Sequence, residues 1–83
     1  MPLTLRVQSP ADESTVSQSP IVVRGTTAPG AVVSVDGALA DTDAAGNFAC
    51  AVDLEEGANV IEVVASDLTG AQLAVDLFVF YEP

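Results

Sequence analysis

Closely spaced turn signals constrain the fold of this chain more than any other feature. Residues 25–48 contain Pro29-Gly30, Asp36-Gly37 and Asp43-Ala44-Ala45-Gly46. Each combination suits a tight turn, because Pro, Asp and Gly adopt the dihedral angles that turns require. The stretches between them are a few residues long. Valine is abundant in the chain and packs well on a pleated strand. The sequence therefore predicts an all-β domain.

Period-two alternation of apolar and polar residues locates the strands and their inward-facing positions. The expected core consists of Leu3, Leu5, Val7, Ile21, Val23, Val33, Val35, Phe48, Cys50, Val52, Ile61, Val63, Ala65, Leu73, Val75, Leu77 and Val79. The last two strands are expected to be joined by a three-residue loop, Leu68–Gly70, with Gly70 in the left-handed region. This loop places Ile61 opposite Leu77 on one apolar face. No segment has a useful helical period, and residues 9–20 are expected to form a polar loop with Val16 as its apolar anchor. Seven strands are expected, at residues 3–8, 21–26, 32–35, 38–41, 48–53, 59–66 and 72–81. This pattern predicts a seven-stranded antiparallel β-sandwich with Greek-key connections, in one domain spanning residues 1–83.

The charge balance excludes two classes of partner. The net charge is −10, with twelve carboxylates, two arginines and no histidine or lysine. Two cations cannot displace the counterions of a nucleic acid, so no nucleic-acid binding is expected. They cannot hold the chain on an anionic membrane either, and no apolar run is long enough for membrane insertion. The acidity is typical of a solvated surface.

The residue types also argue against catalysis. No histidine or lysine is present to activate a serine or threonine. The acidic residues fall at turns or at outward strand positions, where no cleft pairs them for glycoside chemistry. Cys50 is the only cysteine and alternates with Phe48 and Val52, so it is expected to act as a small core residue. The chain is therefore not expected to be an enzyme.

One stretch resembles a calcium-binding loop. Asp41, Asp43 and Gly46 match the opening of such a loop, but Ala45 replaces its third ligand and Val52 stands where the closing glutamate belongs. The segment is therefore either a turn in which Asp and Asn bond to nearby backbone or a weak calcium site. Its ligands would be Asp41, Asp43 and Asn47, and no other cofactor is expected.

The outward face of the last two strands carries unusual apolar content. The expected register places Val60 opposite Phe78 and Val64 opposite Ala74. We interpret Val60, Val64, Phe78 and Phe80 as an interface with a neighbouring module, another protein or a second copy in a weak homodimer. The alternative is that a loop or the first strand covers these residues. The same register opposes Glu62 to Asp76, and Arg6 on the first strand is expected to offset this acidic pair.

Three strings carry a family resemblance: GTTAPGAVVSVDG, DTDAAGNF and VDLEEGANVIEVVASDLTG. They are similar to bacterial immunoglobulin-like modules, and in particular resemble the immunoglobulin-like B domain of glucodextranase and related surface-protein repeats. The resemblance covers residues 9–81 and implies an immunoglobulin-like sandwich without the tryptophan and disulfide of antibody domains. It carries over no catalytic or ligand residues.

The resemblance also implies a role. It indicates a non-catalytic spacer, adhesion or protein-interaction module of an extracellular or cell-envelope protein, with the chain as one module of a longer one. The alternative is a carbohydrate-binding or weak calcium-binding accessory module attached to a glycoside hydrolase or an adhesin. Sugar sites usually present aromatic platforms, and only Phe78 and Phe80 remain once Phe48 and Tyr81 are assigned to the core.

Overall fold

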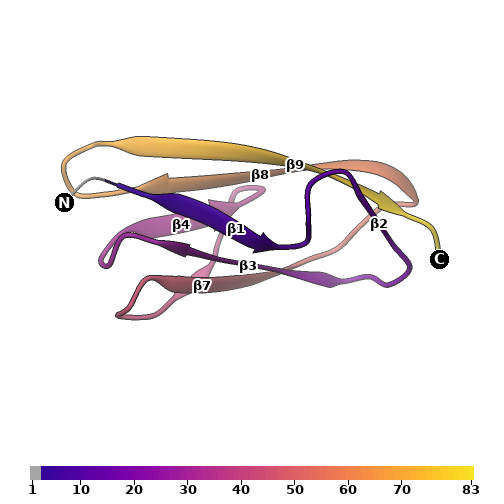
Figure 1. The fold of residues 1–83 in the computed structure, drawn as a ribbon, viewed down its shortest axis with the longest axis horizontal. Helices are drawn as coiled ribbons and strands as arrows, with labels where there is room; N and C mark the ends of the chain where they lie inside the picture. The colour runs from indigo at the N-terminus through magenta and orange to yellow at the C-terminus, as the bar shows by residue number, and fades with distance from the viewer. Residues whose placement is uncertain (1–2) are drawn as a thin grey trace.

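The computed structural model describes residues 3–83 and consists of two packed β-sheets (Figure 1). Sheet 1 has the strand order β1-β3-β7-β6, and sheet 2 has the order β2-β9-β8-β4-β5. The strands are β1 (Leu5–Ser9), β2 (Ser14–Val16), β3 (Ile21–Thr27), β4 (Val32–Val35), β5 (Ala38–Leu39), β6 (Asp41–Thr42), β7 (Asn47–Val52), β8 (Gly57–Ser66) and β9 (Gln72–Tyr81). This order is the immunoglobulin arrangement with its first strand divided between the sheets, so the all-β class is confirmed.

The expectation of seven strands is wrong, because the described residues form nine. The additional β2 lies in the segment expected to be a polar loop, where Val16 packs against the core. The strand expected at residues 38–41 is two short strands in different sheets, β5 and β6. Ala40 separates them, and its N–H donates to the carbonyl of Val33 at 2.9 Å while its side chain packs against the core.

The sandwich is also not wholly antiparallel. β2 pairs with β9 in parallel, with Ser14 opposite Val79 and Val16 opposite Tyr81. The chain crosses from sheet 1 to sheet 2 after β1 without reversing direction, so β2 runs the same way as β9 (Figure 1). The sequence did not indicate this pairing, because β2 has only one apolar residue.

The predicted register of the last two strands is confirmed. Ile61 lies opposite Leu77, Val60 opposite Phe78 and Glu62 opposite Asp76. Gly70 has a φ of 89° in the connecting loop, as expected. Asp36 and Gly37, with φ of 50° and 85°, form the two-residue connection between β4 and β5. Positive φ at both positions is the type I′ geometry that suits a tight hairpin.

The core lies between the sheets and is built mainly from β-branched residues. Its largest fully buried side chains are Val23, Val33, Val35, Ile61, Val63 and Val79. Several expected core residues are only partly buried: Leu3, Leu5, Val7, Ile21, Cys50 and Val75. Leu73 was expected in the core but is 41% exposed. It lies on the part of β9 that β2 does not reach, which explains the incomplete cover.

The expected pairing of Arg6 with Glu62 and Asp76 is wrong. Arg6 lies on β1, which pairs with β3 in sheet 1, whereas both carboxylates belong to sheet 2. Leu5 and Val7 face the core, so Arg6 projects from the outer face of sheet 1. Alternation along a strand shows whether a side chain faces the core or the solvent, but it does not show which sheet the strand joins. The acidic pair on sheet 2 is therefore left without this cation.

The molecule is elongated, with extents of 40 × 18 × 18 Å. β1 begins near one end of the long axis, and the C-terminus lies at the other (Figure 1). None of the residues described forms a helix suited to crossing a bilayer.

Candidate functional site

A hollow on the outer face of sheet 1 contains all three predicted metal ligands. Arg24 on β3 and Asp41 on β6 both pair with Ala49 of β7, so they flank this small residue across the sheet. Because the side chain of Ala49 is only a methyl group, an open hollow of about 390 Å³ remains between Arg24 and Asp41. The complete lining is Arg24, Asp41, Thr42, Asp43, Asn47, Phe48 and Ala49.

Asp43 organises the turn at one end of this hollow. Its Oδ1 accepts hydrogen bonds from the N–H groups of Ala45, at 3.0 Å, and Asn47, at 2.9 Å. Its Oδ2 accepts a bond from the Asn47 side-chain amide at 3.1 Å. The backbone N–H and then the side chain of Asn47 lower the pKa of Asp43, because both bonds favour the charged carboxylate.

These bonds support the turn interpretation of the segment while leaving the calcium hypothesis a prediction. Both Asp43 oxygens already have donors, and the guanidinium of Arg24 lines the same hollow. Within residues 3–83, no three His, Cys, Asp or Glu side chains gather as a metal-binding group. Sequence reasoning missed Arg24, because only the strand order β3-β7-β6 brings it next to Asp41.

A second aspartate, Asp67, holds the β8–β9 loop in the same way. Its Oδ1 accepts bonds from the Thr69 hydroxyl at 2.6 Å, the Thr69 N–H at 2.9 Å and the Ala71 N–H at 3.1 Å. The Thr69 hydroxyl is the main reason why the pKa of Asp67 is lowered. Both exposed turns therefore depend on an ionised carboxylate.

The two lowered pKa values predict acid sensitivity with a defined sign. A carboxylate with a lowered folded-state pKa stabilises the fold above its unfolded value, near 3.8, and this contribution is lost as pH falls through the folded value. Thermal melts at about pH 5 and pH 2 should show a smaller drop in Tm for Asp43→Asn/Asp67→Asn than for the wild type. Asp53→Asn, which removes an exposed carboxylate elsewhere, is the control. An equal drop in the double variant would contradict the assignment.

The predicted interface residues lie on the outer face of sheet 2. Val60, Phe78 and Phe80 are 55%, 46% and 42% exposed, and Val64 is partly exposed. Their neighbours in the sheet follow the predicted register, with Val60 opposite Phe78 and Val64 opposite Ala74. The structure thus places these side chains outward as expected, while their role as an interface stays a prediction.

An acidic pair divides this apolar surface in two. Glu62 and Asp76 lie opposite each other on the same face, between the Val60–Phe78 pair and the Val64–Ala74 pair. Val60, Phe78 and Phe80 therefore form one patch, called the phenylalanine patch below. Beyond the acidic pair, Ser34 lies between Val64 and Leu39 in adjacent strands. Leu39 is 75% exposed and was missed, because its short strand could not be assigned a face from sequence.

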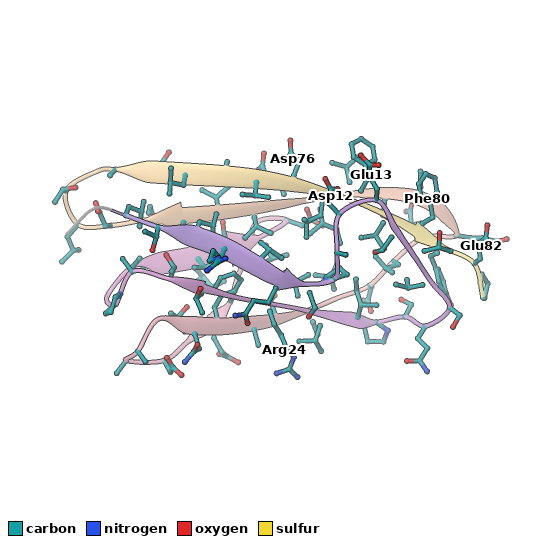
Figure 2. All side chains as sticks on the ribbon, in the orientation of Figure 1. Asp12, Glu13, Arg24, Asp76, Phe80 and Glu82 are labelled. Atoms are coloured by element: carbon teal, nitrogen blue, oxygen red, sulfur yellow. The ribbon has the colours of Figure 1, made fainter. Side chains whose placement is uncertain are left out.

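The loop before β2 borders the phenylalanine patch. Glu13 lines an open hollow of about 410 Å³ together with Phe78 and Phe80. Asp12 Oδ1 accepts a hydrogen bond from the Phe78 N–H at 2.8 Å. Figure 2 shows Asp12, Glu13, Asp76 and Phe80 on the same side of the molecule, with Arg24 on the opposite side. The patch is therefore framed by carboxylates and lies away from Arg24.

Comparison with known proteins identifies the family. The sequence profile described as "Glucodextranase, domain B" matches residues 3–82. The chain belongs to this family. The predicted resemblance to an immunoglobulin-like glucodextranase B domain is thus confirmed.

A solved structure shares the fold of this glucodextranase B-type domain. It is the crystal structure of an engineered protein from the Northeast Structural Genomics Consortium, with a TM-score of 0.69 and 21% sequence identity. The match covers 98% of this chain but only 19% of that chain, so the domain spans about a fifth of its length. No match was found among curated proteins. The family description supports an accessory module of a glycoside hydrolase.

Proposed function

We propose that this domain is a non-catalytic structural module that holds its neighbours apart in a longer extracellular or cell-envelope protein. One observation carries the proposal: β1 begins near one end of a body 40 Å long and 18 Å wide, and the C-terminus lies near the other end (Figure 1). Neighbours attached at these two positions would be separated by the full length of the sandwich.

The attachment of the terminal strands supports this role. β2 and β9 pair in parallel, and the Glu82 N–H donates to the Val16 carbonyl at 2.9 Å, just after the last strand. At the other end, the Thr27 hydroxyl donates to the Thr4 carbonyl at 2.7 Å. The segments at Thr4 and Glu82 are thus both bonded to the sandwich, which favours a fixed separation over a flexible one.

The chemistry of the chain supports the absence of catalysis in this proposal. Its sequence lacks histidine and lysine, so no serine or threonine has a nitrogen base to activate it. The family description names one lettered domain of glucodextranase, which fits an accessory role beside a catalytic domain. A secreted glycoside hydrolase is accordingly the proposed kind of parent protein.

The test is the distance between the two ends of the domain in solution. Spin labels on cysteines introduced at Thr4 and Glu82, in a Cys50→Ala background, report this distance by pulsed electron resonance. Both positions are exposed, so labels there leave the core intact. We expect a single narrow distribution, because both ends are bonded to the sheets. A broad distribution would contradict a spacer with fixed length.

Weak calcium binding in the sheet 1 hollow is the second candidate function. The observation in its favour is that Asp41, Asp43 and Asn47 line one hollow. Arg24 opposes cation binding there, so a melt with several millimolar calcium should shift Tm little in the wild type. Arg24→Gln should increase the shift in Tm. A ligand at about 100 times its Kd raises the free energy of unfolding by roughly 2.7 kcal/mol, which sets the upper range of the effect. Asp41→Asn should abolish any shift. A flat Tm in both wild type and Arg24→Gln removes the candidate.

The phenylalanine patch is proposed to contact a neighbouring module of the parent protein. Val60, Phe78 and Phe80 are close together and exposed, which is typical of contact surfaces. A weak homodimer through the same patch is the alternative, although the net charge of −10 opposes the approach of two copies.

A further inference from the structure

The outer edge of β9 is only partly covered. β8 pairs with β9 along its whole length, from Gln72 to Tyr81. On the opposite edge, β2 reaches only Val79, Phe80 and Tyr81. Among residues 3–83, no strand pairs with this edge between Gln72 and Leu77. A strand edge of this kind presents backbone groups that pair readily with another chain.

The direction of the backbone groups follows from two hydrogen bonds. The Phe78 N–H donates to Asp12, and the Glu82 N–H donates to Val16, so both groups point away from β8. Backbone groups of alternate residues in an antiparallel pair point to the same side. Ala74 and Asp76 therefore direct their N–H and C=O groups toward the open edge, which supplies two donors and two acceptors.

The side chains beside this edge also lack contacts: two apolar side chains are partly exposed, and two like charges lie opposite each other. Leu73 and Val75 point toward the core, yet Leu73 is 41% exposed and Val75 is only partly buried. On the outer face, Asp76 lies directly opposite Glu62, an arrangement of like charges that destabilises a sheet. Arg6 lies on the other sheet and does not offset this pair. Among residues 3–83, nothing gives this edge full apolar cover on one face or a cation on the other.

We propose that the β9 edge from Gln72 to Leu77 binds an extended segment of a partner protein, in which cationic and apolar residues alternate. The segment adds a strand to sheet 2 through hydrogen bonds to Ala74 and Asp76, a known mode of peptide recognition. Residues that pair with Leu73 and Val75 face inward and cover them, whereas residues that pair with Asp76 face outward beside its carboxylate. This interaction is independent of the spacing role.

Charge selects this occupant over a second copy of the chain. Pairing two β9 edges would bring the Glu62 and Asp76 carboxylates of both copies into one sheet face, and each copy carries a net charge of −10. Asp12 and Glu13 add carboxylates at the end of the open edge where β2 begins (Figure 2). An acidic edge attracts a basic strand and repels its own copy.

The proposal can be tested with a seven-residue peptide of alternating Lys and Val and a twin in which Glu replaces Lys. NMR titration and amide hydrogen exchange of the ¹⁵N-labelled domain locate the binding. We expect the Lys peptide to slow exchange of the Ala74 and Asp76 amides at least tenfold at saturation, and the Glu peptide to leave them unchanged. Raising the salt concentration should weaken binding, because these charges are exposed.

Two pairs of variants distinguish an added strand from non-specific attraction. Ala74→Pro removes an outward N–H, which an edge strand tolerates, and should weaken binding at least tenfold, whereas Ala74→Ser should not. Asp76→Lys should weaken binding similarly, whereas Asp53→Lys, with the same change of charge, should not. Should Ala74→Pro fail to fold, the two lysine variants still decide the question.

Three results would overturn the proposal. The first is unchanged exchange at Ala74 and Asp76 with millimolar Lys peptide. The second is equal binding of the Lys and Glu peptides. The third is that the wild type binds neither peptide while Asp76→Ala dimerises, which would show that Asp76 only guards the edge against self-pairing.

Discussion

Replacing Gly46 with alanine is expected to be among the most destabilising single changes in this domain. Gly46 has a φ of 92°, and an added Cβ would lie 2.1 Å from the Thr27 carbonyl oxygen. The Thr27 N–H donates to the Gly46 carbonyl at 2.8 Å, so the two backbones cannot separate without losing this bond. Backbone strain of about 1–2 kcal/mol and overpacking of about 1–3 kcal/mol together give a loss of about 2–5 kcal/mol.

Gly57→Ala is the matched control for this prediction. Gly57 has a similar φ of 96°, but no heavy atom lies within 4 Å of its added Cβ. This variant should therefore lose only the strain contribution, about 1–2 kcal/mol. Urea unfolding measures both free energies. Equal losses of unfolding free energy in the two variants would contradict the prediction that the close approach of Gly46 to Thr27 excludes a side chain at position 46.

Truncation of Phe48 to alanine is expected to cost about 3–5 kcal/mol. Phe48 is 3% exposed and lies opposite Gly25, and its ring atoms come within 2.6 Å of where a Gly25 Cβ would be. The ring thus fills the space that Gly25 leaves open, and its removal creates a cavity between the sheets. A domain of this size has a total stability of about 5–15 kcal/mol, so the variant should be close to unfolding at 37 °C.

Phe78→Ala provides the comparison, because it makes the same chemical change on the solvent-exposed face. We expect a loss of about 1 kcal/mol or less there. Chemical denaturation of both variants measures the difference. Similar losses for Phe48 and Phe78 would contradict the assignment of Phe48 to the core.

The sequence was informative wherever local chemistry determined the structure. Alternation in residues 59–66 and 72–81 was sufficient to predict the β8–β9 register, because a shift by one residue would expose Ile61 and Leu77. Turn residues located the connections at Gly30, Gly37 and Gly70, all of which have positive φ. Both signals lie within a few residues of the structure that they determine.

Features that depend on contacts distant in sequence were not predictable in the same way. The parallel pairing of β2 with β9 joins residues more than sixty positions apart, and β2 has only one apolar residue to indicate it. The break at Ala40 moves the chain to the other sheet without a proline or glycine signal. The expected position of Arg6 was wrong for a related reason, since the alternation is the same whichever sheet β1 joins.

The candidate surfaces show the same division. Asp41, Asp43 and Asn47 were predictable as a group because they lie within the single hairpin of β6 and β7, whereas Arg24 enters their hollow only through the strand order. The outward position of Phe78 and Phe80 followed from strand parity. The open edge of β9 required knowledge of where β2 ends, and no pattern in the sequence indicates that position.

The separation of the two ends of the domain tests the central claim most directly. With spin labels at Thr4 and Glu82, a fixed spacer should give one narrow distance distribution close to the 40 Å length of the molecule. The width of the distribution is decisive. A flexible chain with the same number of residues has a similar mean separation of its ends, roughly 50 Å, but a broad spread. A broad distribution, or a narrow one much shorter than the molecule, would contradict a role in holding neighbouring domains apart.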